Sequence, residues 1–174
     1  MLTIPKAIQE IIYRLEDNGH TAYIVGGAVR DCYLGKAPQD WDIATSAQPP
    51  TVAALFPDSH QIGAQFGTIS VPIKKFGIVE ITTFRAEGPY TDGRHPDYVH
   101  FSTDLIHDLS RRDFTCNALA YHPTKGLIDH FGGLVDLRQG VLRSVGKPEE
   151  RLQEDALRVL RAFRLQTTLE LTLD

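Results

Sequence analysis

The chain has 174 residues, of which 42% are hydrophobic and 23% are charged, and its formal net charge is −4. These values are ordinary for one globular domain with its own core, and the net charge argues against a generic basic nucleic-acid binder. No apolar run approaches the roughly 20 residues of a membrane-spanning helix, and the N-terminus lacks a signal-peptide pattern. Cys32 and Cys116 are distant and form no disulfide framework. We therefore expect a cytoplasmic protein without a membrane partner.

The first part of the chain predicts a helix, a strand, a glycine turn and a second helix. Apolar residues at helical spacing predict the first helix over 5–18. A short apolar strand over 22–25 runs into Gly26-Gly27, and a short helix follows over 28–34. Such a turn presents backbone N–H groups at a helix N-terminus, which favours an anion such as phosphate.

Two carboxylates follow on the next predicted strand. Asp40 and Asp42 are two residues apart, so both side chains would project from the same face. An isolated pair of this kind is typical of surface carboxylates at a strand edge or turn. Beside a phosphate-binding turn, however, the pair offers the hard oxygen ligands that Mg²⁺ prefers, and the metal would serve attack on a phosphate. Glu80, on a neighbouring strand, is a candidate third ligand, although we favour an exposed strand residue there.

The middle of the chain predicts a short helix, a β-hairpin and a loop. Prolines bound the helix over 49–57. Two β-rich runs, 67–73 and 78–84, flank a turn over 74–77 and predict the hairpin. Residues 85–96 contain many turn-forming residues, so we expect a mobile loop with a functional role there.

The rest of the chain predicts further strands and two helices. We expect a strand over 98–101, a mostly helical segment over 105–119, a strand running into a glycine turn over 126–133, and a last helix over 146–165. The order of elements predicts an α+β domain with a small mixed sheet backed by helices.

The last predicted helix is amphipathic. Wound at 100° per residue, its apolar face would comprise Leu152, Ala156, Val159, Leu160 and Phe163. Its other side would carry Arg151, Glu154, Asp155, Arg158, Arg161 and Arg164. A solvated face with i,i+4 pairs such as Glu154–Arg158 explains this pattern. Alternatively, Asp155 and Arg158 offer an acceptor and a forked donor to a nucleobase edge, and Arg161 and Arg164 extend the row toward phosphates.

Two arginine sites also have two interpretations. Arg30 lies one helical turn past Gly27 and would reach a phosphate held there, or it would pair with Asp31 instead. Arg111 and Arg112 are adjacent, so we expect at least one of them to be available for a phosphate or an acidic partner. The glycine turn is neither a Walker A loop nor a dinucleotide-binding fingerprint, and the histidines lack metal spacing.

Taken together, these stretches resemble the head domain of class II tRNA nucleotidyltransferases, the CCA-adding enzymes, and of the related bacterial poly(A) polymerases. Four ordered motifs carry the resemblance: Gly26-Gly27-x-x-Arg30-Asp31 with Asp40-x-Asp42, Arg111-Arg112-Asp113-Phe114-Thr115-x-Asn117-Ala118, Asp129-x-Phe131-Gly132-Gly133-x-x-Asp136-Leu137, and Glu154-Asp155-x-x-Arg158. The resemblance implies a nucleotidyltransferase fold related to polymerase β. It also implies a catalytic head over 1–140 and the truncated start of a helical neck over 141–174.

The resemblance further implies a role for each candidate residue. Asp40 and Asp42 would be catalytic and bind Mg²⁺, while the triphosphate would be held by Gly26, Gly27 and Arg30. Arg112 and Asn117 would contact the nucleotide and Asp113 its ribose, Asp155 and Arg158 would read the base, and Arg161 and Arg164 would complete the pocket. An RNA 3′-hydroxyl would attack the α-phosphate of CTP or ATP and release pyrophosphate. The 85–96 loop is similar to a flexible family loop thought to help the switch from C to A addition.

The expected function is therefore addition of CMP and AMP to the tRNA 3′ end. A poly(A) polymerase, or an enzyme that adds only CC or only A, is an alternative within the same family. A non-catalytic RNA- or nucleotide-binding module is a more distant alternative, against which the intact Asp40 and Asp42 pair argues. Family members continue through neck, body and tail domains that bind tRNA, so we expect this chain to be a fragment with a weakened grip on tRNA.

Overall fold

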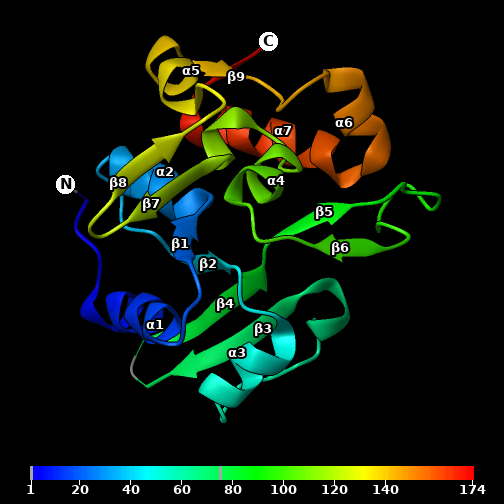
Figure 1. Cartoon of the computed structure of the whole chain (residues 1–174). Coiled ribbons are helices and arrows are strands. Elements are labelled where there is room, and N and C mark those ends of the chain that lie inside the picture. Colours follow the sequence, from blue (N-terminus) through cyan, green and yellow to red (C-terminus); the bar gives the residue numbers. More distant parts are fainter. Residues whose placement is uncertain (1, 75) are drawn as a thin grey trace.

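The main layer of the computed structural model, which describes residues 2–74 and 76–174, is a six-stranded sheet of order β3-β4-β2-β1-β7-β8 (Figure 1). Its strands are β1 (Ala22–Val25), β2 (Trp41–Thr45), β3 (Thr68–Ile73), β4 (Gly77–Thr83), β7 (Leu119–His122) and β8 (Gly126–Asp129). β2 and β4 are parallel, and the other neighbouring pairs are antiparallel. The expected α+β fold with a mixed sheet is confirmed.

Three helices pack against one face of this sheet. They are α1 (Lys6–Asp17), α2 (Gly27–Tyr33) and α3 (Pro49–Leu55). Ile8 and Ile12 of α1 are fully buried in the larger apolar cluster, together with Ile24, Ile43 and Ile81 from the strands. The i, i+4 spacing of Ile8 and Ile12 places them on one face, which explains why α1 lies along the sheet. All three helices expected in this part of the chain are confirmed.

The opposite face of the sheet carries a smaller apolar cluster and the carboxylate of Asp42. The buried members of this cluster are Val25, Ala44, Phe84, Leu109 and Ala120. α4 (Leu105–Ser110) contributes Leu109 to it. Strand side chains alternate between faces, so Asp42 shares the face of Ala44 while Ile43 points into the larger cluster. The alternation along β2 thus separates the carboxylate from the main core.

The segment that follows β4 begins as a hairpin strand. β5 (Arg85–Glu87) pairs antiparallel with β6 (Val99–Phe101), so the prediction of a loop over 85–96 was wrong at its start. The turn-forming residues begin only at Gly88-Pro89, which is why the strand extends to Glu87. The strand expected over 98–101 is confirmed as β6. The β3–β4 hairpin is also confirmed, although Lys75 of its predicted turn lies outside the described residues.

The helix expected over 105–119 was wrong in its second half. α4 ends at Ser110, a short 3₁₀ turn, η2 (Thr115–Asn117), follows, and β7 begins at Leu119. The Asp113 carboxylate accepts the backbone N–H of Phe114 at 2.8 Å and the Asn117 side-chain amide at 3.1 Å. Such local side-chain bonds compete with helical ones, so the chain turns here instead of continuing as a helix.

The last expected helix is interrupted. α6 (Pro148–Glu154) ends just before Asp155, and α7 (Leu157–Leu169) begins just after Ala156. Oδ1 of Asp155 accepts the backbone N–H of Leu157 at 2.9 Å, in the manner of a helix cap. The prediction of a single helix over 146–165 was therefore wrong, because the Asp155 carboxylate caps the start of a second helix.

The apolar face predicted for the last helix was also wrong. Leu160 and Phe163 are 65% and 55% exposed, whereas Arg158 is only 7% exposed. Ala162 and Leu165 of α7 are the residues that join the larger apolar cluster. Because α7 begins at Leu157, its buried side is not the side predicted from one helix over 146–165. Arg158 is buried because it donates hydrogen bonds to several acceptors, which are described below.

The C-terminal part of the chain shares the main core. α5 (Gly133–Gln139) leads into β9 (Val141–Leu142), which pairs in parallel with β10 (Thr172–Leu173). The remaining short element is a 3₁₀ turn, η1 (Ala64–Phe66).

The domain division at residue 140 stays a prediction. Within residues 2–74 and 76–174, no helix combines the length and apolar character needed to cross a membrane.

Candidate active site

A cavity of about 1130 Å³ opens between the sheet, the β5–β6 hairpin and α7. Every candidate residue from the sequence lines it: Gly26, Gly27, Arg30, Asp40, Asp42, Arg112, Asp113, Asn117, Asp155, Arg158, Arg161 and Arg164. Glu80 lines it as well. The fold therefore brings together motifs that lie far apart in the sequence.

The glycine turn forms one wall of the cavity. Gly26 has φ 74° and ψ −137°, a conformation that residues with a Cβ rarely adopt. A Cβ at Gly26 would also lie 2.8 Å from Nη1 of Arg112. At Gly27 a Cβ would meet the guanidinium of Arg30 at 3.4 Å, because Arg30 folds back over the start of α2. The glycines thus allow two arginines to approach the backbone closely.

The carboxylates lie beside this turn. Asp42 is in β2, whereas Asp40 lies in the bend just before the strand and not on it as expected. Asp42 is directly opposite Glu80 in the parallel β2–β4 register, and Glu80 is exposed as predicted. Burial raises the pKa of Asp42, the carboxylates of Glu80 and Asp40 raise it further, and Arg112 opposes this effect. A cation at this position would relieve the repulsion among the carboxylates.

The donor set at this position fits Mg²⁺. Asp40 and Asp42 offer only oxygen ligands, the type that Mg²⁺ prefers. Among the described residues, no cluster of three or more His, Cys, Asp or Glu side chains forms a metal cage. Mg²⁺ commonly uses one or two carboxylates and completes its shell with substrate phosphates and water. The pair beside an open cavity matches that arrangement better than a site built entirely from protein ligands.

A chain of polar contacts runs from α2 to α7. Arg30 pairs with Asp31 at 2.8 Å, as one of its two interpretations predicted, and its Nη1 donates to Oδ1 of Asn117 at 2.5 Å. Asn117 donates in turn to Asp113 at 3.1 Å. Oδ2 of Asp113 accepts both Nε and Nη2 of Arg161 at 2.7 Å. The candidate phosphate, ribose and pocket residues therefore bind one another directly.

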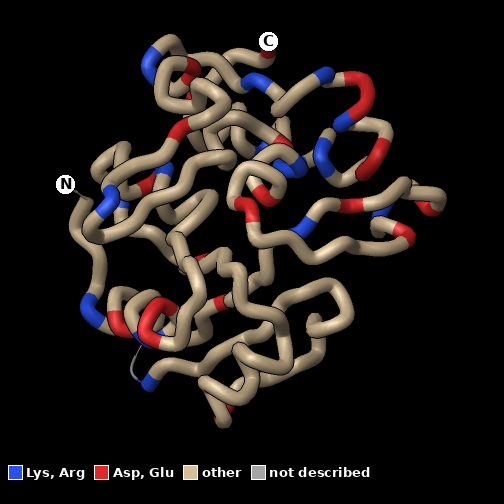
Figure 2. The backbone as a smooth tube through the Cα atoms, in the orientation of Figure 1, with Lys and Arg blue, Asp and Glu red and all other residues tan. Residues whose placement is uncertain are grey.

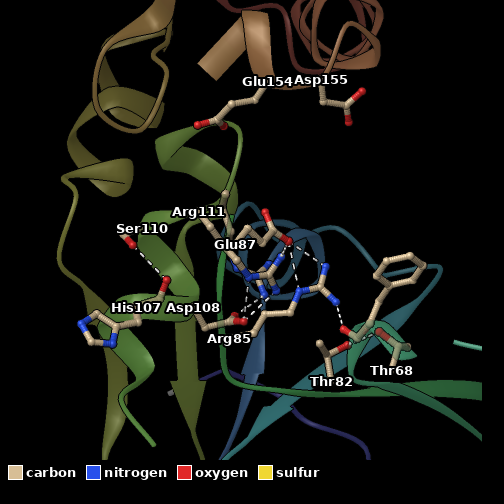
Figure 3. A network of polar contacts seen from close by, with 12 residues as sticks. Thr68, Thr82, Arg85, Glu87, His107, Asp108, Ser110, Arg111, Glu154 and Asp155 are labelled. Atoms are coloured by element: carbon tan, nitrogen blue, oxygen red, sulfur yellow. Dashed lines mark hydrogen bonds and ion pairs between the residues drawn. The ribbon is translucent and has the colours of Figure 1, made fainter. Parts of the chain in front are cut away.

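A second network joins β5 to the end of α4 (Figure 3). Glu87 Oε1 accepts Nη2 of Arg85 and Nη1 of Arg111, each at 2.8 Å. Asp108, which is fully buried, accepts Nη2 of Arg111 at 2.7 Å and Nη2 of Arg112 at 3.1 Å. Arg111 and Arg112 are each 16% exposed, both line the cavity, and both pair with acidic side chains, which is one of the two alternatives expected for them. Asp108 explains this, since it gives both arginines one shared partner.

No motif in the sequence pointed to Asp108, Arg85 or Glu87. The signals were present: Asp108 lies three and four residues before the two arginines, a spacing at which helical side chains meet. Arg85 and Glu87 are two residues apart, which places them on one face of a strand. Burial acts to raise the pKa of Glu87, but Arg111, the Tyr90 hydroxyl and Arg85 outweigh it and lower the pKa.

The candidate base-reading residues are engaged with other side chains. Nη1 of Arg94 donates to Oδ2 of Asp155 at 2.8 Å, and the backbone N–H of Ala156 donates to the Gly93 carbonyl at 3.1 Å. Arg158 donates to Glu154 at 2.6 Å, the pair that the solvated-face interpretation predicted. In Figure 3, Glu154 and Asp155 lie on the upper segment above the Glu87 network, and their side chains extend to opposite sides. The side chains of Asp155 and Arg158 thus share the cavity but bind different partners.

Charges of both signs gather along β5, the loop after it and α6 (Figure 2). The cations that line the cavity are all arginines: Arg30, Arg85, Arg94, Arg111, Arg112, Arg158, Arg161 and Arg164. Arginine presents a planar fork of donors suited to phosphate and to base edges. A chain of net charge −4 therefore still concentrates anion-binding groups at one place.

Paired carboxylates at a glycine turn, facing an arginine-lined cavity on a mixed sheet, define a candidate nucleotide-binding site of the metal-dependent kind. Residues 22–143 match the model of the poly(A) polymerase head domain, and the chain belongs to that family.

Three relatives show how far the similarity extends. The CCA-adding enzyme of Streptococcus pyogenes serotype M2 is 45% identical over 177 residues, which cover 100% of this chain and 44% of that enzyme. The crystal structure of the Bacillus stearothermophilus CCA-adding enzyme in complex with CTP matches with a TM-score of 0.88 and 40% identity, over 98% of this chain and 42% of that one. The Thermotoga maritima CCA-adding enzyme complexed with tRNA matches with a TM-score of 0.76 and 27% identity, over 98% and 40% of the two chains. This chain spans less than half the length of each of these relatives.

Proposed function

We propose that this chain is the catalytic head, with the start of the neck, of an enzyme that adds CMP and AMP to the 3′ end of tRNA from CTP and ATP. The observation that supports the proposal best is the single cavity that joins Asp40 and Asp42 to Asp155 and Arg158. The similarity to an enzyme crystallised with CTP adds to it. The head would comprise residues 1–140 and the neck segment 141–174. The free thiols of Cys32 and Cys116 fit a reducing cytoplasm.

In the proposed reaction the glycine turn holds the triphosphate. The backbone of Gly26 and Gly27 approaches the phosphates closely because neither residue has a Cβ. Arg30 contributes a guanidinium that Asp31 and Asn117 already orient, so little side-chain entropy is lost when phosphate binds. Arg112, bound to Asp108, stands across the turn and adds a second positive charge.

Asp40 and Asp42 hold Mg²⁺ in this proposal. When bound, Mg²⁺ supplies stabilisation of charge on the attacking and leaving oxygens. The residues of the chain do the positioning: they align the 3′-hydroxyl of the RNA with the α-phosphate, so that the new P–O bond forms as the bond to pyrophosphate breaks. Burial, followed by repulsion from Glu80 and Asp40, raises the pKa of Asp42, and a bound cation would stabilise its ionised form.

The far side of the cavity selects the nucleotide in the same proposal. Asp113 and Asn117 contact the ribose, and Arg161 and Arg164 complete the pocket near the phosphates. Asp155 and Arg158 read the base with a carboxylate acceptor and a guanidinium donor. Since Asp155 binds Arg94 and Asp113 binds Arg161 in this structure, nucleotide binding exchanges these internal partners for groups of the substrate.

Transfer assays test the proposal. The chain is incubated with Mg²⁺, each nucleoside triphosphate separately, and three RNAs: tRNA lacking CCA, tRNA lacking only the final A, and an unrelated RNA. We expect CMP incorporation into the first and AMP incorporation into the second. Addition of many adenylates to the unrelated RNA would show a poly(A) polymerase instead. Binding of CTP without any transfer, even at tRNA concentrations far above those that saturate the full-length relatives, would favour the non-catalytic alternative.

A further inference from the structure

A tyrosine of the loop after β5 lies against the arginine that we propose reads the base. The guanidinium carbon of Arg158 is 5.8 Å from the centroid of the Tyr90 ring and lies over its face. This distance is within the range of a cation–π interaction. Both residues line the same cavity. No motif in the sequence pointed to Tyr90.

The Tyr90 ring is itself anchored to the head. Its hydroxyl donates to Oε2 of Glu87, while Oε1 of Glu87 accepts Arg85 and Arg111 at 2.8 Å. Burial and the bond to Glu87 raise the pKa of the Tyr90 hydroxyl, so the phenol stays protonated and keeps donating. The side chains of Arg85, Glu87 and Arg111 are each 16% exposed or less, so the anchor is a largely buried part of the cavity wall.

The hydrogen bonds of Arg158 leave one edge of its fork available. Nη1 donates to Glu154 at 2.6 Å and to the Arg151 carbonyl at 3.0 Å, and Nη2 donates to the Arg111 carbonyl at 3.3 Å. A guanidinium has five N–H donors in a rigid plane. Within the described part of the chain, Nε and one Nη2 hydrogen remain for a ligand. Nε and Nη2 are bonded to the same guanidinium carbon, so the remaining donors lie close together and can serve acceptors on a base edge.

We propose that Tyr90 is a positioning residue whose ring fixes the plane of Arg158, so that the remaining donor edge faces the incoming base and sets the discrimination among nucleotides. This inference rests on the proposed function, because it assigns a selectivity role within the same site. Glu87 and Arg111 tie the ring to α4, and the ring therefore acts as a rigid wall. Preorganising a long side chain in this way favours the nucleotide that matches its geometry.

The ring and the hydroxyl of Tyr90 make separable contributions. Tyr90→Phe keeps the face beneath Arg158 and loses only the bond to Glu87. Tyr90→Leu loses both the face and the bond. Tyr13→Leu is a matched control, because Tyr13 is an exposed tyrosine of α1 outside the cavity.

The first measurement follows Arg158 directly in the free chain. The ¹⁵N relaxation of its Nε–H group, assigned by comparison with Arg158→Lys, gives the order parameter of the guanidinium. We expect high order in the wild type, Tyr90→Phe and Tyr13→Leu, and a clear loss in Tyr90→Leu. An Arg158 that is equally ordered in Tyr90→Leu overturns the proposal, whatever the chain binds.

The second measurement is calorimetric binding of CTP, ATP, GTP and UTP. We expect the wild type to prefer CTP and ATP, and Tyr90→Leu to lose about five- to tenfold of that preference. Tyr90→Phe should restore most of it. If the wild type is selective and Tyr90→Leu is equally selective, the specificity role of Tyr90 is wrong. If the wild type itself shows no preference, the proposed function fails, and the order parameter still decides whether Tyr90 positions Arg158.

Discussion

The two walls of the cavity are held in place by different means. On the acidic wall, Asp42 takes its position from the β2–β4 register, while Asp40 lies in the bend just before β2 and Gly26 in the turn after β1. On the basic wall, side-chain ion pairs join residues far apart in the chain, such as Arg111 with Glu87 and Arg94 with Asp155. The acidic wall therefore depends on the backbone, whereas the basic wall depends on a balance of charges.

This difference has consequences for how each wall fails. The strands behind Asp42 are part of the larger apolar cluster, so changing one carboxylate leaves the sheet intact. The basic wall contains buried charges, and removing one member leaves its partners buried without compensation. We therefore expect substitutions of the carboxylates in the acidic wall to affect activity alone, and substitutions of the buried charges in the basic wall to affect stability as well.

The largest expected effect is on activity and comes from Asp42→Asn. Nucleotidyl transfer should fall at least about a thousandfold, because a metal site contributes several kcal/mol of transition-state stabilisation. The free energy of unfolding should not fall, since burial, Glu80 and Asp40 disfavour the ionised Asp42 more than Arg112 favours it. Single-turnover transfer measures the loss of activity, and denaturant unfolding measures the free energy of unfolding. Asp58→Asn, on the exposed surface, is the control, and a variant that retains activity would remove Asp42 from the chemistry.

A large effect on stability should come from Glu87→Gln. The substitution leaves Arg85 and Arg111 without a charged partner on β5, and breaking a buried pair in this way costs about 3 kcal/mol in the free energy of unfolding. Glu10→Gln is the matched control, because Glu10 forms an exposed pair with Lys6 at 3.6 Å and should cost less than about 1 kcal/mol. Equal costs for the two variants would show that the basic wall is not held by buried charge.

The pH dependence of this stability provides a second check on Glu87. Its pKa in the folded chain is lowered from 4.5. The stabilisation that ionised Glu87 provides is therefore fully present above pH 4.5 and is lost as the pH falls through the folded pKa. The difference in unfolding free energy between the wild type and Glu87→Gln should shrink on acidification. A difference that is independent of pH down to acid unfolding would contradict the ionic role of Glu87.

The same contrast explains which parts of the molecule the sequence could predict. The strand at 22–25, the glycine turn and the hairpin after residue 67 follow from local patterns, and the structure confirms them. Asp113 and Asp155 interrupt helices that propensity alone predicts, because their carboxylates bind nearby backbone N–H groups. The partners of Arg94 and Arg161 depend on long-range packing, which no local pattern contains. The motifs identified residues that line one cavity, whereas the long-range contacts among them could not be predicted.

A smaller effect should come from Gly26→Ala in the glycine turn. Its comparison with Gly140→Ala distinguishes backbone strain from a steric clash with Arg112. Gly26→Ala should cost about 2 kcal/mol, since a Cβ would be strained at φ 74° and would displace Arg112 at 2.8 Å. It should also weaken CTP binding. Gly140→Ala has a similar φ of 71° with nothing within 4 Å, so it should cost about 1 kcal/mol and leave binding unchanged. Comparable losses of CTP binding in both variants would mean that strain, and not Arg112, is responsible.

The smallest expected effect comes from Arg94→Ala. It tests whether Arg94 competes with the nucleotide for Asp155. Arg94→Ala removes the 2.8 Å pair with Asp155, in which the arginine is 49% exposed, so the unfolding free energy should change by less than about 1 kcal/mol. Because Asp155 no longer has to release Arg94, CTP should bind up to about fivefold more tightly by calorimetry. Lys147→Ala removes a comparable exposed pair with Glu150 away from the cavity and should leave CTP binding unchanged. Weaker CTP binding in Arg94→Ala would mean that Arg94 contacts the nucleotide itself. Arg94 would then pair with Asp155 in the free chain and with the nucleotide in the complex.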